Sequence, residues 1–312
     1  FCDNQLSDIF TDLGNTPLAN SFLTLDMLDK KEISFPLKSL VCQKCFLVQV
    51  DEFEKPQNIF NDYAYFSSYS TSWLEHVKDF SEQMIDRFSL SKNDQVIEIA
   101  SNDGYLLKNF KNYEIPVLGI EPALNVAKIA ENMGIPTVVD FFSSNSVEKI
   151  VNSGIKANLL IAFNVLPHVP NLNDFILGMK KIMDKNGVIV VQFSAYLLDV
   201  IQKCEFDMVY HEHFSYFSLF TLKKIFESVN LEIFDTEKIS VHGGSLRLFI
   251  KSKDNLELKI EERVKKLLEE EEEFGLQKIS TYLEFQKNVE KSKKNIQEFF
   301  TNSKAQGKKI VC

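Results

Sequence analysis

The amino-acid sequence predicts an α/β protein whose central region forms a mostly parallel sheet with helices on both faces. Between residues 95 and 250, short apolar runs alternate with segments of helical periodicity, which is the pattern of such a sheet. The runs Leu159–Ala162 and Val188–Val191 are apolar throughout, as expected of strands that are buried on both faces. A cysteine-containing segment precedes this region, and a charged segment of helical periodicity follows it.

Composition limits the class of protein and its partners. The chain has 312 residues, enough for two domains, and its 45% hydrophobic content is that of an ordinary globular core. A formal net charge of −9 argues against a nucleic-acid partner, although a local pocket can still hold an anionic substrate. No apolar stretch approaches the roughly 20 residues of a membrane span, and no secretory leader opens the chain. We therefore expect a cytoplasmic, monomeric protein without a membrane partner.

Both ends of the chain suggest a larger protein. The chain begins on Phe1 rather than on a methionine, and Lys308–Cys312 resemble the first residues of a buried strand. We therefore expect this chain to be a large piece of a longer one.

Three cysteines in an expected first domain, residues 1–68, predict a structural zinc site. Cys42 and Cys45 form a CxxC pair, and Cys2 precedes them by about 40 residues. Tetrahedral zinc takes four ligands, commonly two such pairs, so the fourth ligand is expected before Phe1. The alternative is a set of buried thiols without a metal. The two remaining cysteines are expected to be ordinary apolar residues: Cys204 and Cys312.

A second domain is expected over residues 69–253. Its first helix, Trp73–Phe88, carries apolar residues at helical spacing, and two further helices are expected at Asn125–Met133 and Leu172–Ile182. Seven strands are expected in the same region: Gln95–Ile99, Val117–Ile120, Thr137–Val139, Leu159–Ala162, Gly187–Phe193, Leu231–Thr236 and Ser245–Lys251.

The first of these strands carries Glu98 near its end and leads into a loop of small residues. This loop contains Ala100, Asn102 and Gly104, and small residues let a cofactor approach the backbone. Ligands of such sheets bind outside the carboxyl ends of the strands. The segment therefore predicts a cofactor loop, although it has one glycine where a phosphate-binding loop has more.

Two later strand ends add polar side chains. Glu121 follows the second strand, where a carboxylate can accept hydrogen bonds from both hydroxyls of a ribose in NAD enzymes and methyltransferases alike; the alternative is a surface acid. Asn164 and His168 follow the fourth strand. A cationic sulfonium needs no phosphate cradle and suits acidic loops, so the pattern favours S-adenosylmethionine over NAD. Together these residues look like the class I (Rossmann-like) methyltransferase fold.

Acid–base groups are concentrated between Glu205 and Ser218. His211 and His213 flank Glu212, and Tyr210 precedes them, which is a suitable set for proton transfer near neutral pH. A metal site formed by His-x-His is one alternative, but a catalytic metal usually has three protein ligands and no third is evident. A structural hydrogen-bonding role is the other alternative.

Residues 254–312 are expected to form a solvated helix or helix pair. Apolar residues recur there at helical spacing among many charges, and Glu269–Glu273 is the densest acidic run.

With these residues assembled, the chain resembles the sugar C-methyltransferase family, which includes 3-C-methyltransferases of nucleotide-linked deoxysugars. The resemblance runs along nearly the whole chain and is most specific in Tyr210–Phe217 (YHEHFSYF) and His242–Arg247 (HGGSLR). It is also carried by other segments: Asp12–Gly14, Pro17–Phe22, the CxxC pair, Tyr65–Ser70 and Glu98–Gly104.

The resemblance implies an N-terminal zinc-binding module, a central S-adenosylmethionine-dependent methyltransferase domain, and a third α/β domain that would start near Lys309 and be truncated here. The catalytic positions that it implies are His213, Glu212, Tyr210, His168 and Tyr65. The cofactor-binding positions that it implies are Tyr69, Glu98, Ala100, Asn102, Gly104, Glu121, Phe142 and Asn164. The zinc ligands that it implies are Cys2, Cys42 and Cys45.

The implied chemistry is C-methylation of a nucleotide-diphosphate 4-keto-sugar through an enolate. His213 is expected to remove the proton at C3, Tyr210 or His168 to steady the enolate oxygen, and Glu212 to orient the histidine. An O-methyltransferase that uses the same cofactor is one alternative. A non-catalytic protein that binds zinc and a nucleotide is the other.

Overall fold

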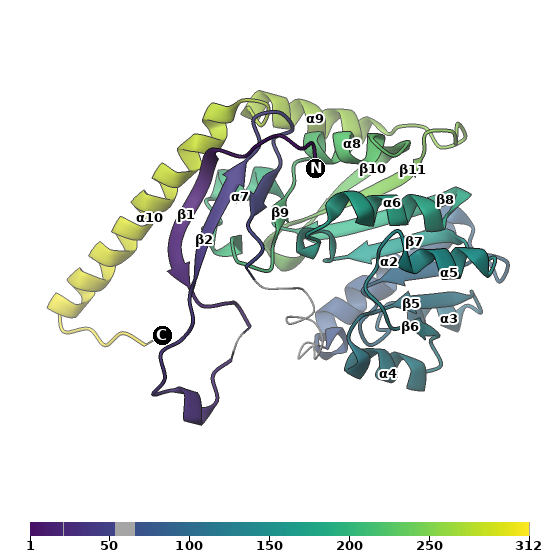
Figure 1. Ribbon diagram of the computed structural model, residues 1–312, viewed down its shortest axis with the longest axis horizontal. Coiled ribbons are helices and arrows are strands. Elements are labelled where there is room, and N and C mark those ends of the chain that lie inside the picture. The colour runs from purple at the N-terminus through teal and green to yellow at the C-terminus, as the bar shows by residue number, and fades with distance from the viewer. Residues whose placement is uncertain (21, 54–65, 312) are drawn as a thin grey trace.

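The structure is a computed structural model that describes residues 1–20, 22–53 and 66–311. Two sheets organise the chain, a four-stranded sheet near the N-terminus and a seven-stranded sheet in the centre (Figure 1). Four strands form the first sheet, in the order β1 (Asp8–Thr16), β2 (Phe35–Val41), β3 (Val48–Val50) and β9 (Ser215–Tyr216).

The central sheet confirms the seven strands expected from the sequence. Its order is β10 (Leu231–Ile239), β11 (Ser245–Ser252), β8 (Met183–Ser194), β7 (Ala157–Phe163), β4 (Val96–Ile99), β5 (Val117–Ile120) and β6 (Thr137–Val138). The five strands from β8 to β6 are parallel, whereas β11 is antiparallel to both of its neighbours. The sheet is therefore mixed. A short turn joins β10 to β11, so the two strands form an antiparallel hairpin at one edge of the sheet.

Helices cover both faces of this sheet. On one face, α2 and α3 contribute to a core that includes Leu159 and Ile161; on the other, α5 and α6 pack against Leu160 and Ala162. This alternation along β7 explains why its sequence is apolar throughout. The helices of this region are α2 (Thr71–Phe88), α3 (Leu107–Asn112), α4 (Leu124–Asn132), α5 (Ser146–Asn152), α6 (Leu172–Ile182), α7 (Leu197–Lys203) and α8 (Leu219–Glu227).

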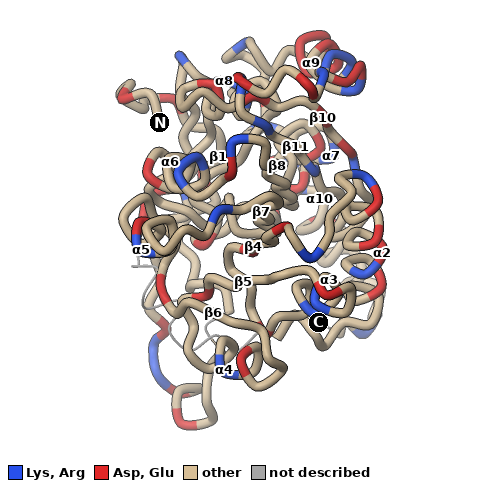
Figure 2. Tube along the Cα trace, turned by 90° about the vertical axis from the view of Figure 1, so that its right-hand side faces the viewer, with Lys and Arg blue, Asp and Glu red and all other residues tan. Residues whose placement is uncertain are grey.

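Most charged residues lie on the outside of this arrangement. Acidic and basic residues of both signs follow the outer helices α2 and α9, while the central strands carry few (Figure 2). Among the described helices, none combines the length and the apolar composition that crossing a bilayer requires. Short 3-10 turns connect several elements: η1 (Leu25–Met27), η2 (Ser67–Tyr69), η3 (Leu166–His168), η4 (Phe206–Met208) and η5 (Val241–Gly243).

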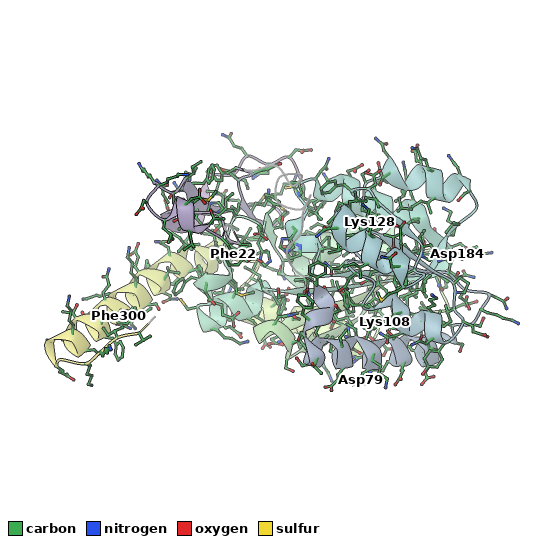
Figure 3. The ribbon with its side chains drawn as sticks, turned by 90° about the horizontal axis from the view of Figure 1, so that it is seen from below. Phe22, Asp79, Lys108, Lys128, Asp184 and Phe300 are labelled. Atoms are coloured by element: carbon green, nitrogen blue, oxygen red, sulfur yellow. The ribbon has the colours of Figure 1, made fainter. Side chains whose placement is uncertain are left out.

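The C-terminal helices α9 (Glu262–Phe274) and α10 (Ile279–Ala305) confirm the expected helix pair. The first part of α10 packs on β1, where the rings of Phe10 and Phe285 stack with centroids 4.4 Å apart and Gln286 Oε1 accepts hydrogen bonds from Thr11 and Asp12. The far end, which carries Phe300, projects away from the rest of the protein (Figure 3). Residues 308–311 form no strand and are exposed, so the strand expected there is absent from the structure.

Glu271 corrects the expectation that the acidic run is wholly solvated. Its side chain is fully buried, its Oε1 accepts hydrogen bonds from the Tyr196 hydroxyl (2.6 Å) and the Leu219 amide (2.5 Å), and its Oε2 accepts one from the Phe220 amide (2.8 Å). These amides belong to the first turn of α8, which has no partners for them within the helix. A carboxylate from α9 therefore caps α8.

Glu271→Ala should lower the free energy of unfolding by about 3 kcal/mol or more, because it leaves buried donors without an acceptor. Glu272→Ala, a neighbouring change at an exposed position, is the matched control and should have almost no effect. Urea unfolding of both variants measures the difference. Equal stabilities would contradict the capping role.

Candidate active site

A cavity of about 690 Å³ opens at the carboxyl ends of β4, β5 and β7. From β4 the chain continues to β5 and β6 on one side, and then crosses to β7 and β8 on the other. The loops that follow β4 and β7 therefore diverge, and such a switch point is where open α/β sheets bind ligands. The cavity is lined by residues from these loops and by the segment that precedes β9.

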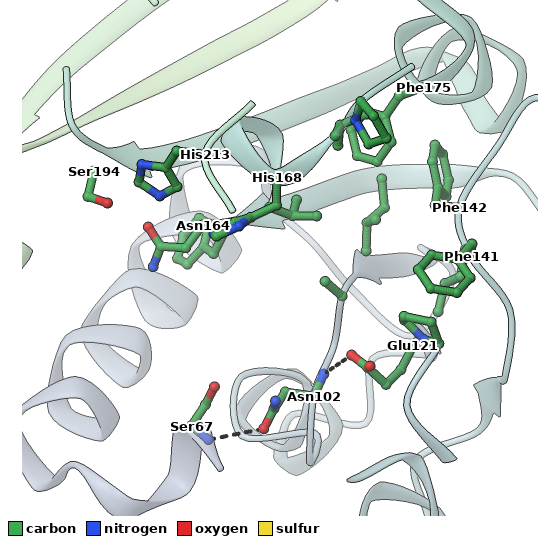
Figure 4. Close-up of a pocket in the computed structure, with 18 of the residues that line it drawn as sticks. Ser67, Asn102, Glu121, Phe141, Phe142, Asn164, His168, Phe175, Ser194 and His213 are labelled. Carbon is green, nitrogen blue, oxygen red and sulfur yellow. Dashed lines mark hydrogen bonds between the residues drawn. The ribbon is translucent and has the colours of Figure 1, made fainter. Parts of the chain in front are cut away.

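Glu121 organises one half of the cavity. Its Oε2 accepts a hydrogen bond from the Asn102 amide and its Oε1 one from the Ala123 amide, both at 2.9 Å (Figure 4). The Asn102 side chain in turn accepts a hydrogen bond from the Ser67 amide at 3.0 Å. Burial raises the pKa of Glu121 although both amides oppose this shift. The carboxylate thus fixes the loop after β4 and still faces the cavity.

Three acids are buried close together beneath this half: Glu98, Asp103 and Glu121. Burial raises the pKa of Glu98 well above its usual value, the Tyr105 hydroxyl opposes the shift, and the other two carboxylates add to it. Among the described residues, no cation contributes to these shifts. A cationic ligand would relieve the repulsion, so the acids fit a sulfonium cofactor.

Aromatic and amide groups complete this half of the cavity. Phe141, Phe142 and Phe175 lie together at one end, where they form an apolar surface suited to a flat aromatic ring (Figure 4). The Oδ1 atom of Asn164 is buried and has no hydrogen-bond partner among the described residues, so it can accept a bond from a ligand. Ala100 also lines the cavity.

The other half of the cavity is lined by Tyr210, His213 and His168. The Tyr210 hydroxyl and His213 Nε2 are hydrogen-bonded at 2.7 Å, and the ring centroids of His168 and His213 are 4.8 Å apart. Burial, followed by the neighbouring His168, holds the pKa of His213 well below its usual range, and burial lowers the pKa of His168 to about 4. Both imidazoles are therefore neutral at physiological pH.

The two residues between Tyr210 and His213 point away from the cavity. His211 and Glu212 are buried but do not line the cavity: His211 Nε2 is hydrogen-bonded to the Pro36 carbonyl, and Glu212 Oε1 accepts a bond from Asn20. His211 is held at Pro36 outside the cavity that His213 lines, and among the described residues no group of three metal-binding side chains includes either histidine.

Three predicted cofactor positions lie outside the described lining of the cavity: Glu98, Tyr69 and Gly104. Glu98 is fully buried beneath it, and Tyr69 is 78% exposed with its ring against Phe66. Gly104 has a φ of +78° and its Cα faces Ile135, where a Cβ would meet Cδ1 at 2.5 Å; its role is to let a turn pack. Tyr65, a predicted catalytic residue, lies outside the described residues.

Some lining residues were missed by sequence reasoning. The sequence places Trp73 only in a helix and His242 only in the HGGSLR segment of the resemblance, yet both line the cavity and their ring centroids lie 4.9 Å apart. His242 has a φ of +51°, an uncommon conformation for a residue with a side chain. The HGG string was the signal that could have placed His242 at a special turn.

The predicted zinc ligands are brought together. The sulfur atoms of Cys2, Cys42 and Cys45 all lie within 4.8 Å of one another. Burial raises the pKa of Cys42, but hydrogen bonds from the amides of Cys45 and Lys44 and from the neighbouring thiols outweigh it and lower the pKa to about 7, whereas burial raises the pKa of Cys45. Metals bind thiolates, so this donor set fits zinc.

Family models match three consecutive parts of the chain. Residues 1–60 match a model described as "Putative zinc binding domain", residues 73–236 match "Methyltransferase domain", and residues 240–312 match "C-methyltransferase C-terminal domain". The chain is also 30% identical over 298 residues to C-methyltransferase NovU from Streptomyces niveus, covering 96% of this chain and 70% of that protein. The chain belongs to the C-methyltransferase family.

As a member of this family, the protein is an S-adenosylmethionine-dependent methyltransferase with a zinc-binding module. This removes the alternative of a non-catalytic binding protein. The solved structures similar to it include an S-adenosylmethionine-dependent methyltransferase from Clostridium acetobutylicum ATCC 824, at 12% identity and TM-score 0.45, covering 57% of this chain and 92% of that one. Another is magnesium protoporphyrin IX methyltransferase from Synechocystis PCC 6803 with bound SAH, at 14% identity and TM-score 0.46, covering 57% and 83%.

Glu121→Ala in this C-methyltransferase should weaken the binding of S-adenosylmethionine by about 1–3 kcal/mol, the range for hydrogen bonds to a charged group. Glu121→Gln should lose less, because it keeps one acceptor oxygen. Titration calorimetry measures both, with Glu131→Ala, an exposed acid on α4, as the control. An unchanged affinity in Glu121→Ala would refute the assignment of this carboxylate to the cofactor.

Proposed function

We propose that this C-methyltransferase methylates C3 of a nucleotide-linked 4-keto-deoxysugar through an enolate. One observation carries the proposal: the hydrogen-bonded pair Tyr210–His213 shares a single cavity with five of the residues assigned to the cofactor, which are Ala100, Asn102, Glu121, Phe142 and Asn164. A proton-accepting pair is needed where a carbon–hydrogen bond must break before methylation.

The C4 ketone of such a sugar acidifies the hydrogen at C3. When the C3–H bond breaks, the proton goes to the enzyme and the electron pair moves toward the C4 oxygen, giving an enolate whose C3 is nucleophilic. S-adenosylmethionine, when bound, supplies the electrophilic methyl group that C3 accepts. We assign the cofactor to Glu98, Ala100, Asn102, Glu121, Phe142 and Asn164, with Gly104 shaping the turn beside them.

His213 is the final acceptor of the C3 proton in this proposal. Because its Nε2 is already bonded to the Tyr210 hydroxyl, the proton reaches it through that hydroxyl: the Tyr210 oxygen takes the C3 proton while its own proton moves to Nε2. His168, a neutral ring beside His213, is the candidate donor to the enolate oxygen. Glu212 is proposed to orient His213 from outside the cavity. Tyr65 remains a candidate catalytic residue.

The lining of the cavity bears on how the substrate enters. No lysine or arginine is found among the described residues that line it. A diphosphate is best bound by such groups, so we propose that the sugar ring enters the cavity while the diphosphate and nucleoside stay outside it. A volume of about 690 Å³ is adequate for a cofactor and a sugar ring together.

We further propose that the protein is a cytoplasmic monomer with no nucleic-acid or membrane partner. Three thiols gathered at a metal site suit a reducing compartment. We propose a division of the chain at residues 1–68, 69–253 and 254–312.

The enzyme should exchange the C3 proton of a 4-keto-sugar nucleotide with deuterated water when the demethylated cofactor is bound, because the enolate then has no methyl group to accept. His213→Ala and Tyr210→Phe should each slow exchange and methyl transfer together, by about 10²–10⁴-fold. Mass spectrometry and NMR of the sugar measure both rates. Tyr113→Phe, which changes an exposed tyrosine, is the matched control.

Two results would contradict this mechanism. Normal exchange in both His213→Ala and Tyr210→Phe would place the base elsewhere. Methylation of a hydroxyl with C3 still protonated would establish the O-methyltransferase alternative, which has no reason to exchange a carbon-bound proton.

The exchange rate should stay level as the pH falls from 8 to 6.5, and decline only below that. His213 must be neutral to accept a proton, and its pKa lies well below 6.5 because the ring is buried beside His168. The Tyr210–His213 pair therefore stays active down to a lower pH than a pair with an exposed histidine would, because His213 becomes protonated only at that lower pH. Initial rates across this range test the expectation, with circular dichroism to exclude unfolding; a half-maximal rate at or above pH 6.5 would contradict it.

A further inference from the structure

The segment that carries Tyr210 and His213 continues into the sheet of the zinc-binding module. Its next strand, β9, pairs with β3, where Val48 lies opposite Tyr216 and Gln49 opposite Ser215. The Val50 amide also donates a hydrogen bond to the Phe214 carbonyl at 3.1 Å. The module and the candidate catalytic segment therefore share one hydrogen-bonded sheet.

Inside this segment, side chains face two directions. Tyr210 and His213 face the cavity, whereas His211 is held by the module through the Pro36 carbonyl, 3.1 Å from its Nε2. The rings of Phe35 and Phe53 lie against the His211 ring with centroids 6.2 and 5.9 Å away. His211 is thus an anchor in the module rather than a second base.

Glu212 is the second anchor, and its partner is Asn20. The Asn20 side-chain amide donates a hydrogen bond to Glu212 Oε1 at 2.9 Å, and the Glu212 side chain is buried. Asn20 has a φ of +58°, a conformation that asparagine adopts more readily than most residues. The backbone of Glu212 hydrogen-bonds the His168 imidazole, so the position of Glu212 also affects that ring.

We propose that Asn20 is a positioning residue of the active site: by binding Glu212 it holds the segment 210–213 so that His168 and His213 keep their places in the cavity. This proposal rests on the proposed function only where it is tested by the rate of C3 exchange. It makes the loop after β1, in the zinc-binding module, part of the catalytic apparatus although it does not line the cavity.

The geometry distinguishes this role from general stabilisation. Asn20 is itself exposed and has one described side-chain bond, the bond to Glu212, so replacing it removes little buried surface. Among the described residues, Asn20 is the one hydrogen-bond donor to the buried Glu212 carboxylate, so the substitution mainly affects the position of Glu212. An effect confined to catalysis is therefore expected.

The test is a donor–acceptor exchange across this bond. Asn20→Asp keeps the size and the backbone preference but sets two carboxylates against each other, and should lower kcat for exchange by about 10-fold or more while KM and cofactor affinity stay unchanged. Adding Glu212→Gln restores a donor–acceptor pair in the reverse direction, and should recover most of the loss relative to Asn20→Asp alone. A panel of nucleoside diphosphate 4-keto-6-deoxyhexoses is the probe.

A second readout needs no substrate. The NMR resonances of the His168 and His213 rings in the full chain, loaded with zinc and S-adenosylhomocysteine, should shift in Asn20→Asp and return toward their original positions in the double variant. Asn15→Asp, at an exposed position on β1, is the matched control and should shift neither. Zinc content should equal one per chain in all variants.

The outcomes separate this proposal from the proposed function. Unchanged ring resonances in Asn20→Asp, or a double variant no closer to the original than the single one, would overturn the positioning role. If the unmodified enzyme exchanges no C3 proton with any sugar of the panel, the proposed function fails, and the ring resonances alone then decide the role of Asn20.

Discussion

The pairing of β3 with β9 is the contact on which the arrangement of the active site depends. If residues 210–213 contacted the central sheet alone, their side chains would all be positioned by that one domain. Because β9 belongs to the N-terminal sheet, the residues before it lie between two modules, and neighbouring side chains are held from opposite sides. Tyr210 and His213 face the cavity, while His211 and Glu212 bind the zinc-binding module. The candidate catalytic pair is thus placed by contacts made outside the cavity.

Burial then sets the chemistry of the two halves of the cavity. Exclusion of water disfavours charge, which keeps the imidazoles of His168 and His213 neutral and raises the pKa of Glu98 and Glu121. Neutral imidazoles are able to accept a proton, and clustered buried acids favour a cationic ligand. The same physical effect therefore prepares one half for proton transfer and the other for a sulfonium.

Structural support for this cavity comes from buried polar contacts far from it. Glu271 of α9 caps the helix that follows β9, and Thr221 in that helix donates a hydrogen bond to the carbonyl of Cys45, a predicted zinc ligand. The zinc-binding turn, α8 and the C-terminal helix pair are consequently joined through a few satisfied bonds. Such bonds are costly to break in a buried setting, because the partner left behind loses its hydrogen bond without regaining water.

The sequence by itself determined the α/β class, the seven central strands, the cysteine ligands, and the identity of the polar residues at successive strand ends. These follow from local periodicity and from residue chemistry, which need no knowledge of distant contacts. Tertiary structure decided which of those residues share the cavity. Only the folded chain shows that His211 and Glu212 turn toward Pro36 and Asn20, that Tyr69 is exposed, and that Glu271 is buried in a run that looks solvated. The direction and burial of a side chain depend on what packs against it. For His211, Glu212 and Glu271 the hydrogen-bond partners lie 51 to 192 positions away in the chain, beyond the reach of any local pattern.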